Sequence, residues 1–324
     1  MKTRQLGDTD LKLTTIGLGT WAIGGSWQFG WGHQDDQDSI GAIVDAVEKG
    51  INWIDTAPIY GCGHSEEIVG KALKETRQNP IIATKCGLLW DDKRRKHNNL
   101  DADSIMKECH DSLKRLGIST IDLYQMHWPQ PDRKIEEAWE AMAKLKKKGD
   151  VRHIGVSNFS VPQLKRIMQI EKPASLQPPY SMIDRSIEQE ILPFCGENDI
   201  GVVCYSPMQK GLLTGKYTPE KIGKLPPDDH RHRDSDFAQP KLDIHLELVE
   251  KLKPIAQRNH ATLAQLAIAW VFNQPHVTSA IVGARKPHQV DDNVKAGSWE
   301  ISEQDMQEIS RILEKHDEKL HAAV

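Results

Sequence analysis

The sequence has few cysteines, and none of them is closely paired. The five residues, Cys62, Cys86, Cys109, Cys195 and Cys204, are odd in number and widely spaced, without a CxxC pair. Disulfide frameworks and zinc sites need cysteines at close, regular spacing. The pattern therefore argues against both, predicts no bound metal, and indicates a reducing compartment.

Long hydrophobic runs are also missing. No apolar stretch approaches the ~20 residues that a membrane helix needs. The opening residues 1–5 lack the apolar core of a signal peptide. The sequence thus predicts a cytoplasmic protein without a membrane partner.

Charge of one sign is not in large excess. The 42 lysines and arginines nearly balance the 46 aspartates and glutamates, for a formal net charge of −4. The densest basic run, 93–96, has no aromatic platform or basic helix beside it. It is therefore interpreted as a solvated loop, and no nucleic-acid partner is expected.

What the sequence does contain is a regular alternation of short apolar segments and amphipathic segments. Each apolar segment is hydrophobic on consecutive positions, as expected for parallel strands that are buried on both faces. The strands are predicted at 15–18, 53–55, 81–85, 122–126, 153–157, 175–177, 201–205 and 280–282. The helices are predicted at 39–49, 65–73, 103–116, 135–148, 161–169, 187–197, 261–272 and 288–296.

Eight strands that alternate with eight helices favour one α/β domain, a (β/α)8 TIM barrel, over an open doubly wound sheet. No linker divides the chain, so residues 1–324 are predicted to form a single domain. An N-terminal β-hairpin is expected from 2–6 and 11–14, and extra C-terminal helices at 242–260 and 302–319. The polar segment 210–240 is expected to be functional or disordered.

Four polar residues follow the predicted strands at the end where barrel active sites lie. They are Asp55, Tyr60, Lys85 and His127. An ammonium beside a tyrosine lowers its pKa from ~10 by ~1–3 units, which would make Tyr60 a better proton donor. Asp55 would keep Lys85 charged, and His127 could bind a substrate oxygen that becomes negative. Each residue alone could be a turn former, a surface charge or a packing residue.

The chain resembles the aldo-keto reductase family, most closely the bacterial general-stress and inositol-operon type. The resemblance rests on motifs in family order, among them GLGTW (17–21), IDTAPIYG (54–61), DLYQMHWP (122–129), GVSNF (155–159) and GLLTG (211–215). It implies an oxidoreductase that reduces aldehydes or ketones to alcohols by hydride transfer from NADPH. Tyr60 would be the general acid, assisted by Lys85, Asp55 and His127.

The resemblance also implies a cofactor site across the barrel mouth. Tyr205 would stack on the nicotinamide, and Lys216, Arg231 and Arg285 are cations suited to a 2′-phosphate, which favours NADPH over NADH. The full set is Thr20, Trp21, Asp55, Ser157, Asn158, Gln177, Tyr205, Ser206, Pro207, Met208, Gln209, Lys210, Lys216, Arg231, Gly283, Ala284, Arg285, Gln289 and Asn293. The segment 17–22 matches GxGxxA in spacing, but no helix is predicted after it, so a Rossmann site is not favoured.

Trp21, Trp90 and Trp128 are expected to line the pocket of a small carbonyl substrate; their alternative role is packing beneath loops. The sequence also leaves two other functions open. One is an NADPH-binding regulatory subunit resembling potassium-channel β subunits, although no appended inactivation segment precedes the hairpin. The other is a Schiff-base aldolase using Lys85, which Asp55 disfavours by keeping the amine protonated.

Overall fold

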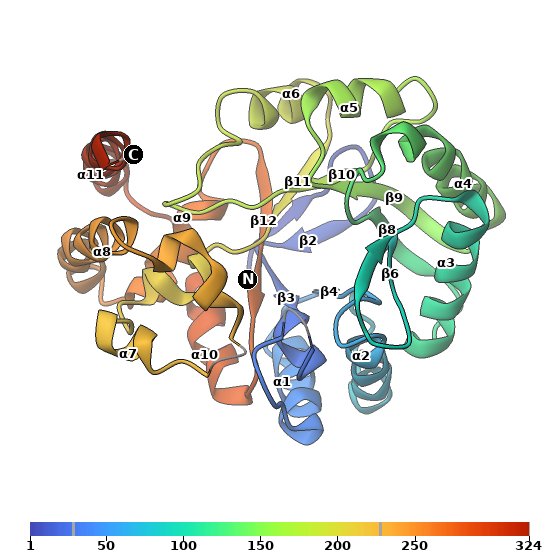
Figure 1. Cartoon of the computed structure of the whole chain (residues 1–324), viewed down its shortest axis with the longest axis horizontal. Coiled ribbons are helices and arrows are strands. Elements are labelled where there is room, and N and C mark those ends of the chain that lie inside the picture. Colours follow the sequence, from blue (N-terminus) through green and yellow to red (C-terminus); the bar gives the residue numbers. More distant parts are fainter. Residues whose placement is uncertain (28–29, 227–228, 324) are drawn as a thin grey trace.

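A closed barrel of eight parallel strands forms the centre of the computed structural model, which describes residues 1–27, 30–226 and 229–323 (Figure 1). Around the barrel the strands are β3 (Ile16–Gly19), β4 (Trp53–Asp55), β5 (Ile81–Cys86), β8 (Ile121–Met126), β9 (Val151–Ser157), β10 (Ser175–Gln177), β11 (Gly201–Cys204) and β12 (Val277–Gly283). Hydrogen bonds between β12 and β3 close the barrel. The TIM-barrel prediction is confirmed, with strand ends shifted by up to three residues.

Among the described residues, eight helices lie between and after the barrel strands and surround them (Figure 1). They are α1 (Asp36–Glu48), α2 (His64–Glu75), α3 (Ala102–Leu116), α4 (Ile135–Lys148), α5 (Val161–Ile167), α6 (Ile191–Glu197), α9 (Leu263–Phe272) and α10 (Pro287–Ala296). Gly117 and Gly149 end α3 and α4 in the left-handed conformation, at φ of 67° and 87°.

Helix α6 begins at Ile191, four residues later than predicted. A helix that began at 187 would place Pro193 in its interior, where the proline ring clashes with the preceding turn. Starting at Ile191 places Pro193 in the first turn, where the missing N–H costs nothing. The residues before it form hydrogen-bonded turns instead.

An N-terminal hairpin of β1 (Thr3–Gln5) and β2 (Lys12–Thr14) packs against the inner residues of the barrel. Its Leu6, Leu11 and Leu13 are buried in one cluster with Trp53 of β4. Gly17 leaves the space for the Trp53 indole, because a Cβ there would lie 2.0 Å from the ring. The hairpin and these side chains fill one end of the barrel, so the open end is the one at which the strands terminate.

Two further helices, α8 (Lys241–Arg258) and α11 (Glu303–Ala323), lie side by side outside the ring (Figure 1). The described residues of the segment 210–240 include α7 (Pro219–Gly223), most of the 3-10 helix η3 (Gln209–Thr214), and the 3-10 helices η4 (His230–Arg233) and η5 (Ser235–Phe237). The loop after β5 also contains a hairpin that was not predicted, β6 (Leu88–Trp90) and β7 (Lys96–Asn98).

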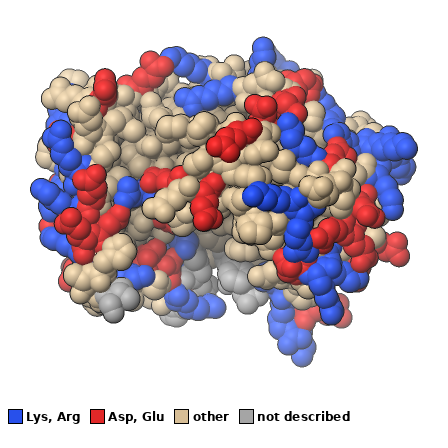
Figure 2. Space-filling view, turned by 90° about the horizontal axis from the view of Figure 1, so that it is seen from above, with Lys and Arg blue, Asp and Glu red and all other residues tan. Residues whose placement is uncertain are grey.

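The surface agrees with the near balance of charges. Lysine and arginine side chains are interspersed with aspartate and glutamate on the face shown in Figure 2. In the basic run, Arg94 and Arg95 are exposed at the turn of the β6–β7 hairpin, and Arg95 pairs with Asp91. None of the described helices is long and apolar enough to cross a membrane.

Candidate active site

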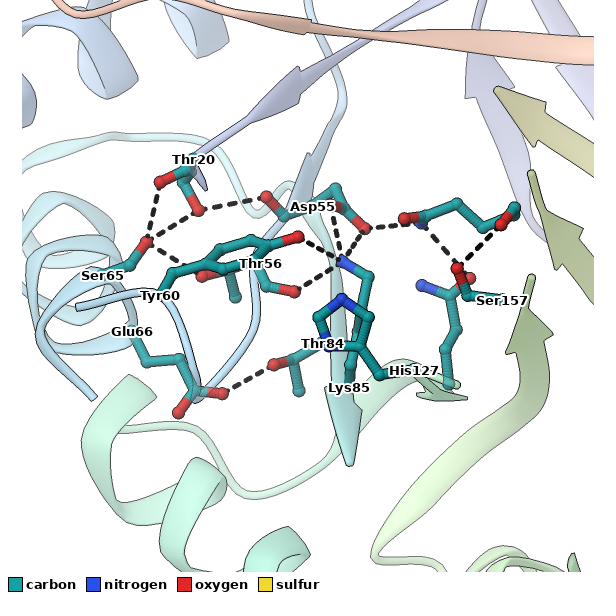
Figure 3. A network of polar contacts seen from close by, with 12 residues as sticks. Thr20, Asp55, Thr56, Tyr60, Ser65, Glu66, Thr84, Lys85, His127 and Ser157 are labelled. Atoms are coloured by element: carbon teal, nitrogen blue, oxygen red, sulfur yellow. Dashed lines mark hydrogen bonds and ion pairs between the residues drawn. The ribbon is translucent and has the colours of Figure 1, made fainter. Parts of the chain in front are cut away.

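The Lys85 ammonium is the centre of a buried polar cluster at the open end of the barrel (Figure 3). Its Nζ donates to both carboxylate oxygens of Asp55, at 2.8 and 2.7 Å, and to the backbone oxygen of Thr56 at 3.0 Å. The fourth partner is the hydroxyl of Tyr60, 3.3 Å away. The Lys85 side chain is 0% exposed, so its charge acts on these groups without screening by bulk water.

The Tyr60 ring is held over this cluster by the turn that follows β4. Gly61 has a φ of 67°, and a Cβ there would lie 2.1 Å from the backbone oxygen of Gly24, so only glycine fits. The His127 ring stands at 81° to the Tyr60 ring, with their centroids 5.9 Å apart. The structure therefore brings together all four residues that the sequence placed at strand ends.

The pKa of Tyr60 shifts in the direction opposite to the sequence expectation. Burial raises the pKa of its hydroxyl well above the ordinary value, and the nearby Asp55 carboxylate raises it further. The expected lowering by Lys85 is outweighed because both Asp55 oxygens face the ammonium and offset its charge. Burial lowers the pKa of Lys85, opposed by the same carboxylate. Tyr60 is thus a protonated phenol with a cation in contact.

His127 is neutral in the folded protein. Burial lowers the pKa of its imidazole well below the usual value, and the charges of Lys85 and Lys96 act in the same direction. A neutral imidazole carries one ring N–H, which can donate a single hydrogen bond. His127 can therefore bind an oxygen in the cavity without competing with Tyr60 as an acid.

A cavity of about 440 Å³ opens above this cluster, and the amide-bearing residues lie along its wall. Gln177 Nε2 donates to Asp55 Oδ1 at 2.8 Å, and Asn158 Nδ2 donates to the backbone oxygen of His127 at 3.0 Å. The Tyr205 hydroxyl donates to Asn158 Oδ1 at 2.8 Å. Gln177, predicted to hold a nicotinamide, is thus bonded directly to the Asp55 carboxylate, and Asn158 is bonded to the backbone of His127.

The rest of the wall contains some of the predicted cofactor residues and leaves out others. Lining residues from the predicted set are Trp21, Asp55, Ser157, Asn158, Gln177, Tyr205, Ser206, Pro207, Met208, Lys210, Gly283, Ala284, Arg285 and Gln289. Thr20, Gln209, Lys216, Arg231 and Asn293 are not among the described lining residues. Asn293 instead donates to the backbone oxygen of Gly283.

Thr20 and Gln209 are buried beneath the wall. The Thr20 hydroxyl donates to the backbone oxygen of Asp55 and accepts from Ser65 Oγ, so it supports the catalytic turn from behind. The Gln209 side chain points away from the cavity, toward Ser181 and Asp236.

Two of the three tryptophans predicted for the substrate pocket lie at the cavity. Trp21 and Trp128 line the cavity. Trp90 does not line it among the described residues: the β6–β7 hairpin places it at a separate, more polar hollow beside Arg94 and Cys62.

Trp27 and Trp31 also line the cavity and were missed. Trp31 stands at 88° to Trp21, with ring centroids 5.8 Å apart. In the sequence, the tryptophans at 21, 27 and 31 follow β3 at close spacing, and this spacing could have indicated that all three lie near the cavity.

Comparison with known proteins identifies this arrangement. The protein-family model described as "Aldo/keto reductase family" matches residues 15–314 of this chain. Aldo-keto reductase YhdN of Bacillus subtilis (strain 168) is 40% identical over 321 residues, which cover 97% of this chain and 94% of that relative. The NADH-specific methylglyoxal reductase of Escherichia coli (strain K12) is 38% identical and covers 97% and 100%. The chain belongs to the aldo/keto reductase family.

Solved aldo-keto reductases share the fold. The glycerol dehydrogenase of Gluconobacter oxydans has a TM-score of 0.89 at 38% identity, over 97% of this chain and 96% of that chain. An aldo/keto reductase from Klebsiella pneumoniae, solved with NADP and acetate, has a TM-score of 0.73 at 27% identity, over 97% and 96%. This aldo-keto reductase is accordingly an oxidoreductase with a nicotinamide cofactor and small carbonyl substrates.

The cations of this aldo-keto reductase differ in how far their charge is offset. Lys210 is paired with Asp234, and Arg231 is paired with Asp229. The Arg285 guanidinium instead donates to neutral oxygens: Gln34 Oε1 at 2.6 Å and the backbone oxygens of residues 31 and 33. Of these three cations, Arg285 is the one that lines the cavity without a carboxylate partner among the described residues.

Proposed function

We propose that this protein reduces aldehydes or ketones to alcohols, using NADPH as the hydride donor and Tyr60 as the proton donor. The observation that carries the proposal is the contact of a buried, protonated phenol with an ion-paired lysine at the floor of the cavity. A neutral His127 beside it offers a second hydrogen bond. Two donors at one point suit an oxygen on which negative charge develops.

The residues along the wall fit a nicotinamide dinucleotide. The Tyr205 ring offers an aromatic face, and the side chains of Asn158 and Gln177 offer the amide groups that a carboxamide needs. Further along, Ser206 and Lys210 adopt left-handed backbone conformations, with φ of 58° and 53°, in a turn that borders the cavity. The bound dinucleotide would supply a hydride to the carbonyl carbon of the substrate.

The chain's own residues control the proton. The substrate oxygen would accept hydrogen bonds from Tyr60 Oη and from the ring N–H of His127. As the oxygen gains charge, it takes the Tyr60 proton, and the Lys85 ammonium stabilises the resulting phenolate. Asp55 holds Lys85 in place through two hydrogen bonds. The same contacts disfavour a Schiff-base aldolase, because a protonated amine is not a nucleophile.

NADPH is preferred to NADH in this proposal because Arg285 retains its charge near one end of the cavity. The relative named as an NADH-specific reductase makes the preference a question for experiment. The tryptophan walls suit a carbonyl compound with an apolar substituent.

The test is the Tyr60→Phe variant. Removing the hydroxyl should lower kcat for aldehyde reduction by about 10²–10⁴-fold, the usual contribution of a positioned acid. The Kd for NADPH should change less than about twofold, because the ring remains. Wild type and Lys107→Ala, which changes an exposed side chain on α3, serve as references. Turnover near the wild-type value would rule out the assigned role of Tyr60, and lack of turnover by wild type on a panel of carbonyl compounds would favour a regulatory function.

A further inference from the structure

The β6–β7 hairpin carries the basic run 93–96 and is held in place from two sides. At the turn of the hairpin, Arg94 Nη2 donates to the backbone oxygen of Gly61 at 3.0 Å, in the loop after β4. At the end of β7, Asn98 Nδ2 donates to Gln130 Oε1 at 2.7 Å, in the loop after β8. The hairpin is therefore anchored to the two loops that carry catalytic side chains.

This anchoring places Lys96 at the cavity. Lys96 is the first residue of β7 and lies opposite Trp90 of β6 in the register of the hairpin. It lines the cavity together with Leu88, which also belongs to β6. Leu88 is buried in one cluster with Ile59, against which the Tyr60 ring packs. The last cation of the basic run is thus a cavity residue, although the sequence indicates a solvated loop.

Lys96 lies on the side of the cavity where the carbonyl group would bind. Burial lowers the pKa of the His127 imidazole, and the positive charges of Lys85 and Lys96 lower it further. His127 is the proposed hydrogen-bond donor to the substrate oxygen. The cations Lys210 and Arg285 instead come from the turns after β11 and β12, which are proposed to hold the dinucleotide. Lys96 is therefore the lining cation on the substrate side.

The wall near Lys96 suits an anion that is joined to an apolar group. Trp27 and Trp128 pack against the same buried cluster as the hairpin and line the cavity. Asp55 is the one acidic residue among the described lining residues, and both of its oxygens accept from Lys85, which offsets its charge. An anion at this wall would thus meet a cation, apolar rings and no uncompensated carboxylate of the described wall.

Lys96 can reach such an anion without removing it from water. The residue is exposed, so a carboxylate beside it keeps part of its hydration and loses little solvation free energy. An ammonium has three N–H groups, so a contact within its own loop leaves donors for a ligand. Its flexible four-carbon stem lets the charged end follow ligands of different length.

We propose that Lys96 binds a carboxylate on the substrate, so that this reductase favours carbonyl compounds in which an apolar chain or ring joins the carbonyl group to an acid group. The inference rests on the proposed function, because Tyr60 and His127 must hold the carbonyl oxygen at the other end of the same molecule. The tryptophan side chains pack against the apolar part. Lys96 then acts on substrate binding, so its contribution is to KM and not to kcat.

The experiment compares para-carboxybenzaldehyde with para-nitrobenzaldehyde, whose nitro group has the shape of a carboxylate without its net charge. Straight-chain aldehyde acids and their amides extend the comparison to other lengths. For each pair, kcat/KM for the acid is divided by kcat/KM for the neutral analogue at saturating NADPH. Any effect of a substitution on His127 cancels in this ratio, because both substrates experience it.

Lys96→Met removes the charge and keeps an unbranched side chain. For the acid that wild type prefers most, the variant should lower the ratio by about fivefold, mainly through KM, which is the upper end of what an exposed ion pair contributes. Lys96→Glu should lower it further, because the two negative charges repel.

Lys93→Met is the matched control, since Lys93 is an exposed lysine of the same basic run but is not among the described lining residues. Its ratio should stay within about twofold of wild type, as expected for an exposed charge without a ligand. In wild type, added potassium chloride should lower the ratio, because salt screens an exposed ion pair. Lys96→Met should lose most of this salt dependence.

A ratio that is the same in wild type, Lys96→Met and Lys93→Met would overturn the inference and leave the proposed function in place. Equal losses with the acid and the neutral analogue would do the same, because Lys96 would then only support the hairpin. The salt titration needs wild type alone, so a ratio that does not fall with salt contradicts the inference even if the variants fold poorly. Wild type that reduces neither member of any pair would instead overturn the proposed function, and the inference with it.

Discussion

At the scale of single residues, burial decides the protonation state of the candidate catalytic groups. Tyr60 stays protonated because desolvation of its phenolate outweighs the neighbouring ammonium. His127 stays neutral because an imidazolium would be buried beside Lys85. The same site therefore holds one proton donor and one neutral hydrogen-bond donor at neutral pH.

The pH profile of reduction follows from these two directions. A raised pKa keeps Tyr60 protonated beyond its ordinary range near 10, and a lowered pKa keeps His127 neutral below the usual 6.5. Carbonyl kcat/KM at saturating cofactor should therefore be flat from about pH 6.5 to 9. An inflection within that range, in a profile measured at constant ionic strength, would show that Tyr60, His127 or Lys85, whose pKa burial lowers, titrates there.

Arg285 should set the preference between the two cofactors. Arg285→Met should lower the ratio of kcat/KM for NADPH to that for NADH by at least about tenfold, because a hydrogen bond to a charged group contributes about 1.5–3 kcal/mol. Gln34→Ala is the matched control, since it loosens the same loop but keeps the cation. Its ratio should change less than about twofold. Equal losses with both cofactors in Arg285→Met would mean that the residue only tethers the loop.

At the scale of elements, the two ends of the barrel have separate tasks. The β1–β2 hairpin fills one end with leucines, whereas β4, β5 and the turns after β4, β8, β9 and β11 carry polar residues at the other. Most element positions could be predicted because apolar runs and glycine stops are local signals. The start of α6 and the β6–β7 hairpin were missed because Pro193 and cross-strand pairing decide them.

A hairpin variant should separate stability from activity. Leu13→Ala removes a side chain that is 1% exposed and should lower the free energy of unfolding by about 2–5 kcal/mol. The folded fraction should keep its kcat and KM, because the hairpin lies at the opposite end from the cavity. The adjacent exposed Lys12→Ala should change stability by less than about 0.5 kcal/mol. Urea unfolding and initial rates would measure both; a large fall in kcat for Leu13→Ala would contradict the separation.

For the whole molecule, the single domain that the sequence predicts for residues 1–324 remains a prediction. The hydrogen bonds between β12 and β3 join the two ends of the chain, and α11 packs on α8. Unfolding should thus be one transition in which tryptophan fluorescence and far-UV circular dichroism coincide. Two resolved transitions would show that the α8–α11 layer unfolds separately from the barrel.

The barrel, the family and the meeting of Asp55, Tyr60, Lys85 and His127 follow from the sequence, because strand order and family motifs place those residues at neighbouring strand ends. The direction of the Tyr60 pKa shift, the inward position of Gln209, and the presence of Trp27 and Trp31 rather than Trp90 at the cavity follow only from the folded structure. Each of these depends on which distant residue lies opposite. Lys210 and Arg231 are both in the cofactor-binding set predicted from the sequence, but in the fold Lys210 is paired with Asp234 and Arg231 with Asp229. Burial and pairing are properties of contacts, and contacts exist only once the chain has folded.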